Sequence, residues 1–365
     1  MGGMTQLNMI DERRYAETMR GTVIPALEAC RDEGWFDPSA AERAAGLEPL
    51  PGNMDTGGRS GQLHYLCYDA AKFDAQREAG ATAAFRGAIV ISHGFTEFAE
   101  KYDELVWYFL LAGYSVCVLD HRGHGKSARD VDNPCLVWID DWRRYVADLA
   151  GFAETIGQSY ADGRPLNLFC HSMGGGIGAA VLERYPSLFD RAVLSAPMIA
   201  PQTGMAMWLA RALVGALCAC GLGRHRVFGQ KDFDGVLDLG PYQLSSEPRE
   251  RWYHQLRCDN PEYQTYCASF EWVRQAMHMN RAVLNPAACA EIETPILLFQ
   301  CGHDIWVRNQ PQTEFVRRVK DGSGQATLVH LPDSEHEVFS MPNKVYEPYL
   351  ERILAFYGEK VLAED

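Results

Sequence analysis

A serine at position 172 has the sequence surroundings of a catalytic nucleophile. It stands in the stretch NLFCHSMGGGIG, in which an apolar run typical of a strand leads into a sharp turn and then into a helical pattern. A strained strand–turn–helix connection holds a serine hydroxyl above the sheet and requires small neighbours. The usual form of this turn is Gly-x-Ser-x-Gly, but here Cys170 precedes Ser172 by two residues and Gly174 follows it by two. The pattern predicts a nucleophilic serine in a turn that departs from the usual form at Cys170.

A serine hydroxyl needs a base that accepts its proton, and the base needs an acid that orients it. Two candidates come directly after later apolar runs: Asp304 in LLFQCGHDIWV and His336 in LVHLPDSEHEVF. The ends of such runs share one edge of a parallel sheet, where Ser172 also emerges. We predict Ser172 as the nucleophile, His336 as the general base and acid, and Asp304 as the carboxylate that fixes the imidazole.

Acyl transfer also needs hydrogen-bond donors that stabilise the negative charge developing on the carbonyl oxygen. In a strand–turn–helix layout one donor is the backbone N–H directly after the nucleophile, and the other comes from the loop after an earlier strand. These positions are Met173 and, in the stretch SHGFTE, Phe95. We predict that the backbone N–H groups of Phe95 and Met173 form an oxyanion hole.

Several alternatives stay open at the level of the sequence. His303 adjoins Asp304 and could carry the proton, and Asp333 lies in the histidine loop and could replace Asp304 as the acid. Cys170 could itself be the nucleophile, although it falls at the strand end rather than at the turn. A further hypothesis is that oxidation of the Cys170 thiol, so close to Ser172, inactivates the protein.

The elements that must position these residues follow a regular alternation. Apolar runs that predict strands alternate with amphipathic segments that predict helices, which implies a mainly parallel sheet covered on both faces. The expected strands are LHYLCY, GAIVISH, YSVCVLD, LNLFC, RAVLSAP, PILLFQC and ATLVHL, and the expected helices span 102–111, 138–156, 173–184, 312–320 and 344–357.

The alternation also divides the chain. Residues 1–59 are expected to form a helical extension (11–47) and a Gly/Pro-rich linker, and residues 60–197 the first part of the core. Between 198 and 285 the pattern is mostly helical and rich in aromatic residues, which predicts a cap over the carboxyl edge of the sheet. Residues 286–365 are expected to complete the core.

One stretch of the predicted cap, from 205 to 223, is long and apolar and contains a single charge, Arg211. We expect a cap or lid helix, because Arg211 lies well inside the run and Ala and Gly are frequent in it. The alternatives are a helix that touches a membrane surface and a true membrane span. Cys218, Cys220 and His225 follow closely, but their spacing does not suit zinc and no fourth ligand is evident.

Composition excludes several function classes. The chain has 365 residues, of which 47% are hydrophobic and 22% charged, as in a folded globular protein. A net charge of −14 argues against nucleic acid as a partner and against electrostatic docking on anionic lipid. Eleven cysteines without framework spacing, and an N-terminal stretch without the order of a signal peptide, lead us to expect a cytoplasmic protein with reduced thiols.

Five motifs together resemble a known family. HGFTEFAEKYDELV, DHRGHGKS, CHSMGG, GHD and SEH are similar, in order and spacing, to motifs of the α/β-hydrolases of the monoacylglycerol lipase and bacterial lysophospholipase type, within the serine aminopeptidase-type hydrolases. The resemblance covers residues 60–200 and 286–357, and FGQKDFD, LSSEPRERW and FEWVRQA look more like a lysophospholipase cap. It implies an α/β-hydrolase fold, with a mainly parallel sheet flanked by helices and a helical cap insertion, and chemistry without a metal or an organic cofactor.

The resemblance supports the positions of the triad and of Phe95 and Met173. It also implies that His93 and His124 hold the geometry of their loops. His171 is expected to pack beside the sheet, and the family usually has glycine where Cys170 stands. We expect a set of residues in these motifs to support the site without reacting: His93, Gly94, Cys170, His171 and Gly174.

Three functions remain in competition. The first is hydrolysis of carboxylic esters of monoacyl lipids through an acyl-enzyme, with a small-molecule acyl ester as the substrate. The second is an esterase, peptidase or acyltransferase activity on another small substrate, which the same residues could serve. The third is a non-catalytic binding protein on the same fold, against which the complete triad argues. The apolar stretch is compatible with transient contact between the cap and a membrane, and the sequence does not indicate an oligomeric state.

Overall fold

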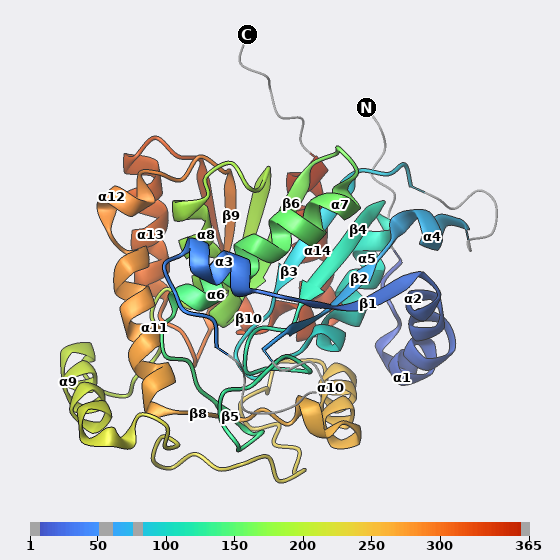
Figure 1. The fold of residues 1–365 in the computed structure, drawn as a ribbon. Coiled ribbons are helices and arrows are strands. Elements are labelled where there is room, and N and C mark those ends of the chain that lie inside the picture. Colours follow the sequence, from blue (N-terminus) through green and yellow to red (C-terminus); the bar gives the residue numbers. More distant parts are fainter. Residues whose placement is uncertain (1–7, 51–60, 76–82, 359–365) are drawn as a thin grey trace.

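An eight-stranded sheet forms the centre of the protein (Figure 1). A computed structural model describes residues 8–50, 61–75 and 83–358, and its main sheet has the strand order β1-β2-β4-β3-β6-β7-β9-β10. The strands from β4 to β10 in this order run parallel, whereas β2 is antiparallel to both of its neighbours. The strands are β1 (Arg31–Phe36), β2 (Leu63–Tyr68), β3 (Gly87–Ser92), β4 (Tyr114–Leu119), β6 (Leu166–His171), β7 (Arg191–Ser195), β9 (Ile296–His303) and β10 (Ala326–Glu335). The predicted mainly parallel sheet is confirmed.

Helices cover both faces of this sheet, as predicted. Residues of α6, α8 and α13 share one apolar core with one face, and residues of α1, α2, α4, α5 and α14 share a second core with the other. The helices are α1 (Tyr15–Thr18), α2 (Ile24–Cys30), α3 (Ser39–Ala44), α4 (Ala70–Ala75), α5 (Asp103–Leu111), α6 (Arg143–Phe152), α7 (Gln158–Ala161), α8 (Ser172–Arg184), α9 (Met207–Leu217), α10 (Glu247–Asp259), α11 (Phe270–Val283), α12 (Pro286–Cys289), α13 (Asn309–Asp321) and α14 (Asn343–Gly358). Because both faces are covered, the central strands are buried along their whole length.

The N-terminal segment differs from the prediction at one place. We expected helices over 11–47, but β1 is a strand that pairs with β2, from Arg31 opposite Tyr68 to Phe36 opposite Leu63. Without β1, the backbone groups on one side of β2 would be left without partners, as at any sheet edge. The side chain of Phe36 is buried in the core, with its ring 6.2 Å from that of Phe152. Pairing and packing together therefore override the local helical pattern.

The cap lies along the lower edge of the sheet in Figure 1, where α9, α10 and a small two-stranded sheet are drawn. The small sheet pairs β5 (Leu136–Val137) with β8 (Cys267–Ala268). The apolar stretch forms α9, followed by a π-helical turn at Cys218–Leu222, and α9 packs against α11. In the ranges that the structure describes, no helix is both long enough and apolar enough to cross a membrane. The stretch therefore forms a helix that packs on α11, and its role as a cap stays a prediction.

Candidate active site

Ser172 stands at the junction of β6 and α8, in a backbone conformation that few residues adopt. Its φ angle is +50°, in the left-handed region. The turn is tight: a β-carbon on Gly174 would lie 2.1 Å from the carbonyl oxygen of Ser92, so position 174 has no room for a side chain. The sequence pattern therefore folds into the predicted strand–turn–helix connection.

The structure joins the three predicted triad residues in one hydrogen-bonded chain. Nε2 of His336 lies 2.8 Å from Oγ of Ser172, and Nδ1 of His336 lies 2.7 Å from Oδ2 of Asp304. The other carboxylate oxygen of Asp304 accepts hydrogen bonds from the backbone N–H groups of Trp306 and Val307, each at 2.9 Å. Burial alone would raise the pKa of Asp304, but His336 and these N–H groups outweigh it and lower that pKa. The carboxylate is therefore held in its charged form beside the imidazole.

The alternative acid and base are placed elsewhere. His303, the last residue of β9, is exposed, and so is Asp333 in β10. In the hydrogen-bonded chain, the imidazole of His336 contacts the carboxylate of Asp304 and the hydroxyl of Ser172. The geometry thus favours Asp304 over Asp333 and His336 over His303.

The thiol of Cys170 lies inside the protein, between the sheet and α8. Cys170 has no exposed surface, and its sulfur atom faces Gly178. Burial raises the pKa of Cys170 far above the usual value for a thiol. Because the thiolate is the reactive form, a buried neutral thiol is a poor nucleophile. These observations argue against Cys170 as the nucleophile, and its oxidation remains an untested hypothesis.

The two predicted oxyanion donors belong to segments that touch each other. Met173 follows Ser172 at the start of α8, where backbone N–H groups have no partner within the helix. Phe95 lies in the loop after β3, and β3 pairs with β6. A β-carbon on Gly174 would lie 2.5 Å from the carbonyl oxygen of His93, so this loop packs directly on the turn. The role of the two N–H groups in holding an oxyanion stays a prediction.

His93 fixes the start of this loop, as the resemblance implies. Its Nδ1 lies 2.8 Å from the carbonyl oxygen of Gly94, and its Nε2 accepts a hydrogen bond of 2.9 Å from the backbone N–H of His121. The pattern assigns the proton to Nδ1, and burial lowers the pKa of His93, so the ring stays neutral. His124 makes a similar contact, with Nδ1 3.1 Å from the carbonyl oxygen of Arg122.

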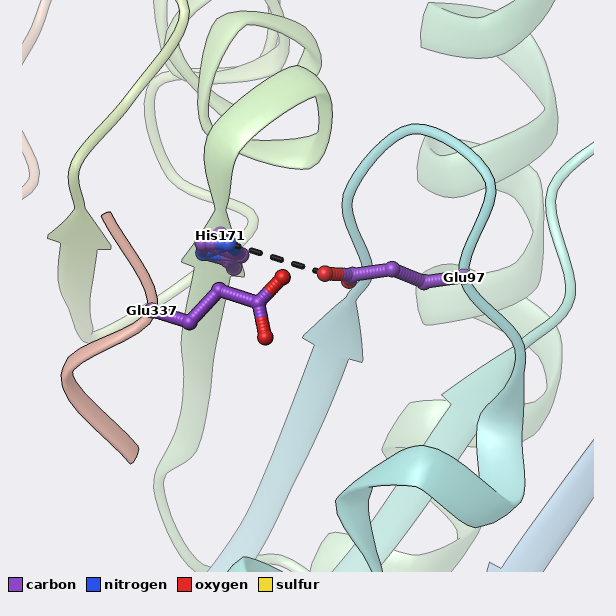
Figure 2. A group of neighbouring side chains, drawn as sticks. All are labelled: Glu97, His171 and Glu337. Atoms are coloured by element: carbon purple, nitrogen blue, oxygen red, sulfur yellow. Dashed lines mark ion pairs between the residues drawn. The ribbon is translucent and has the colours of Figure 1, made fainter. Parts of the chain in front are cut away.

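His171, the last residue of β6, packs under the histidine loop. Its ring lies 4.8 Å from the ring of His336 and 5.0 Å from that of Phe339, and the side chain is fully buried. Among the described residues, neither of its ring nitrogens has a hydrogen-bond partner. Burial lowers the pKa of His171 to about 3, so the ring is neutral at ordinary pH. The neutral ring packs beside His336 with its Nε2 3.6 Å from Oε1 of Glu97 (Figure 2), and its role in supporting the site stays a prediction.

The buried charges beside His171 were not predicted from the sequence. Glu97 and Glu337 point toward one another there (Figure 2), and the ammonium of Lys101 contacts both, at 2.8 Å from Oε1 of Glu97 and 2.7 Å from Oε2 of Glu337. The second oxygen of Glu97 accepts a hydrogen bond of 2.5 Å from the N–H of Gly94. Lys101 thus joins the loop that holds Phe95 to the loop that holds His336. The Glu–Lys spacing of four residues in EFAEK was the available signal.

The two carboxylates and His171 are side chains of the types that bind metal ions. Ligand atoms of Glu97, His171 and Glu337 lie within 4.8 Å of one another, and no other set of three possible ligands was found in the described ranges. However, Lys101 already supplies the positive charge between the two carboxylates. Burial acts to lower the pKa of Lys101, but the two carboxylates outweigh it and raise that pKa, which favours the charged ammonium. The residues present do not fit an added cation.

Comparison with known proteins agrees with the geometry. The family of serine aminopeptidases S33 matches residues 83–343. This chain belongs to that family. It is a hydrolase with the α/β-hydrolase fold, and it is 29% identical over 287 residues to lysophospholipase L2 of Escherichia coli K12, which covers 74% of this chain and 80% of that protein. The family resemblance expected from the motifs is confirmed.

Two other proteins show how far the similarity extends. A monoacylglycerol lipase of Mycolicibacterium smegmatis is 35% identical over 126 residues, which cover 33% of this chain and 41% of that protein. A soluble variant of monoglyceride lipase from Saccharomyces cerevisiae has the same fold, with a TM-score of 0.61 and 19% identity over 81% of this chain and 90% of that one. The similarity to the lysophospholipase thus extends over more of the chain than the similarity to the bacterial lipase.

Proposed function

We propose that this protein is a serine hydrolase that cleaves carboxylic esters of monoacyl lipids, of the lysophospholipase or monoacylglycerol lipase type. The observation that carries the proposal is the hydrogen-bonded chain from Ser172 through His336 to Asp304. The arrangement supplies a nucleophile, a base within reach of it and an acid that orients the base. A non-catalytic binding protein would have no need to keep these three side chains aligned.

The reaction proceeds through an acyl-enzyme. As Oγ of Ser172 attacks the ester carbonyl, Nε2 of His336 takes its proton, and Asp304 stabilises the imidazolium that forms. The N–H groups of Met173 and Phe95 receive the negative charge of the carbonyl oxygen. His336 then gives the proton to the leaving alcohol. Water, activated by the same imidazole, releases the fatty acid from Ser172.

The substrate class rests on relatives and on the cap. A lysophospholipase matches 74% of this chain, and a monoacylglycerol lipase matches 33% of it. From the cap, the ring of Trp272 packs 4.2 Å from that of Phe95, so apolar side chains adjoin the proposed oxyanion hole. An acyl chain needs such an apolar environment. Peptidase, acyltransferase or small-ester activity remains the alternative, since the family itself is described as serine aminopeptidases.

Contact of the cap with a lipid surface is part of the proposal. Trp208 and Leu213 of α9 expose 72% and 48% of their surface, and Ile305 and Trp306 expose 55% and 48% beside Asp304. A hydrogen bond of 2.8 Å from the N–H of Gln202, in the segment that leads into α9, to the carbonyl oxygen of Trp306 ties that segment to the loop of Asp304. Large exposed apolar side chains that gather near a site mark an interaction surface. A peripheral, reversible association of a cytoplasmic protein with membranes would bring it to monoacyl lipids.

Sedimentation with neutral phosphatidylcholine vesicles tests this contact. Replacing Trp208 and Leu213 together by serine should reduce the bound fraction several-fold, because apolar burial drives such binding. Val236→Ser removes an exposed apolar side chain outside α9 and is the matched control. Equal binding of the double variant and the parent would contradict the contact.

Hydrolysis of a panel of substrates tests the proposed reaction. Lysophosphatidylcholine, a monoacylglycerol, a diacyl lipid, p-nitrophenyl esters of increasing length and an aminopeptidase substrate would be compared. We expect the monoacyl lipids to have the highest kcat/KM, and Ser172→Ala to abolish all hydrolysis. Ser159→Ala, an exposed serine on α7, is the control. If only the aminopeptidase substrate were hydrolysed, the proposed substrate class would be wrong and peptidase activity would take its place.

A further inference from the structure

Thr96, next to the predicted oxyanion donor Phe95, has an unfavourable backbone conformation. Its φ angle is +60°. Glycine enters this left-handed region easily, whereas a β-branched residue such as threonine is strained there. A strained conformation persists only where the surrounding structure holds it. The contacts of the loop from Gly94 to Glu97 therefore need to supply that support.

One contact of Thr96 comes from the cap. The hydroxyl of Tyr253, on α10, donates a hydrogen bond of 3.1 Å to the carbonyl oxygen of Thr96. The ring of Tyr253 is itself fixed by the core: the ammonium of Lys101 lies 4.1 Å from its centre, and the ring of Phe98 stacks on it at 5.6 Å. The cap thus reaches the middle of the loop with a side chain that the core orients.

The rest of the loop is held by other residues. The N–H of Gly94 is bound by Glu97, which Lys101 fixes from the side of the core. The ring of Phe95 packs against Trp272, another cap residue. The start of the loop is therefore held from the core, and Tyr253 binds the carbonyl oxygen of the strained residue Thr96.

We propose that Tyr253 is a positioning residue for the oxyanion hole. By holding the carbonyl oxygen of Thr96, it keeps that residue in the left-handed region and keeps the neighbouring N–H of Phe95 turned toward the carbonyl of the substrate. Seating of α10 on the core thus completes the oxyanion hole. This inference rests on the proposed function, because it assigns a step to the Phe95 donor.

A double-mutant cycle tests the proposal with Tyr253→Phe and Thr96→Gly. Loss of the hydroxyl should lower kcat about tenfold on a soluble ester, with KM changed less than twofold, because oxyanion donors act in the transition state. Glycine takes the same conformation without strain. In the Thr96→Gly background, the Tyr253→Phe change should therefore reduce kcat by less than about threefold. Equal losses in both backgrounds, or a change in KM alone, would overturn the proposal.

Two controls separate this test from other causes. Tyr266→Phe makes the same chemical change at a cap tyrosine whose ring packs against Phe233, and it should leave kcat unchanged. Circular dichroism and Tm should show that each variant is folded. If Ser172→Ala kept its activity, the proposed function itself would fail. If Ser172→Ala were inactive and Tyr253→Phe fully active, only the role of Tyr253 would be wrong.

Discussion

The sulfur atom of Cys170 occupies the space that a side chain at position 178 would need. A β-carbon on Gly178, in the second turn of α8, would lie 2.4 Å from this sulfur. The residue that departs from the usual turn pattern is therefore matched by a glycine on the helix that packs over it. The turn keeps its shape around Ser172, whose hydroxyl lies 2.8 Å from His336.

Because Cys170 and Gly178 compete for the same space, a smaller residue at position 170 should compensate for a larger one at position 178. Gly178→Ala should lower the free energy of unfolding by about 1–3 kcal/mol, because an extra methyl group in a packed core forces its neighbours to move. Cys170→Ala/Gly178→Ala should recover most of that loss, since removal of the sulfur makes room. Denaturant titration of the parent and the three variants measures the coupling. Additive losses would mean that the two positions do not compete for space.

A conservative change at Asp304 should separate chemistry from folding. Asp304→Asn keeps the size of the side chain but removes the charge that holds the imidazole in the right tautomer, so kcat should fall by about 10³–10⁴-fold. Asp333→Asn, at the exposed alternative acid, should leave kcat within about twofold, in keeping with ordinary surface substitutions. The opposite ranking of the two variants would show that Asp333 is the acid.

Glu250 of α10 should make the stability of the protein depend on pH. Burial, together with the nearby carboxylate of Glu337, raises the pKa of Glu250 from 4.5 to about 8. The folded state then binds a proton that the unfolded state has lost. The contribution of Glu250 is fully present below pH 4.5 and is lost as the pH rises through about 8.

The matched variant for this effect is Glu250→Gln, which resembles the protonated form at every pH. Relative to it, the parent should lose about 2 kcal/mol of unfolding free energy between pH 6 and 8. Glu247→Gln, an exposed glutamate on the same helix, should behave like the parent. Identical pH slopes for the parent and Glu250→Gln would contradict the assignment.

Lys101 should be far more important for stability than a surface lysine. Lys101→Met leaves two buried carboxylates, Glu97 and Glu337, without their shared cation, and the loss should be about 3–5 kcal/mol. Lys72→Met, which breaks an exposed pair with Asp32, should change stability by less than about 1 kcal/mol. Thermal unfolding of both variants gives the comparison. A small loss for Lys101→Met would mean that the carboxylates relax or become protonated at little cost.

The mainly parallel sheet and the positions of the three candidate catalytic side chains could be predicted from the sequence. Ser172 and Asp304 follow the buried runs of β6 and β9, and His336 follows β10 at the edge of the sheet, so the end of each strand fixes where the next residue emerges. The structure brings Ser172, Asp304 and His336 together, while their catalytic roles and those of Phe95 and Met173 stay predictions. The family and the fold are confirmed by the comparisons.

What the sequence did not predict depends on contacts between distant segments. Gly34 interrupts the helical pattern expected over 11–47, but in β1 it makes room for the ring of Tyr65, which a β-carbon there would approach to 2.4 Å. The close packing of Cys170 against Gly178 likewise leaves no recognisable pattern in the sequence. The strain at Thr96 is a property of the backbone, and its support comes from Tyr253, 157 residues away.

The measurement that tests the central claim most directly is labelling with a fluorophosphonate, followed by location of the adduct by peptide mass spectrometry. The parent should carry one adduct, on Ser172, and lose ester hydrolysis in proportion to labelling. His336→Ala should label far more slowly, because its serine has lost the base. An adduct on another residue, or an active protein that never reacts with the probe, would contradict a serine mechanism at this site.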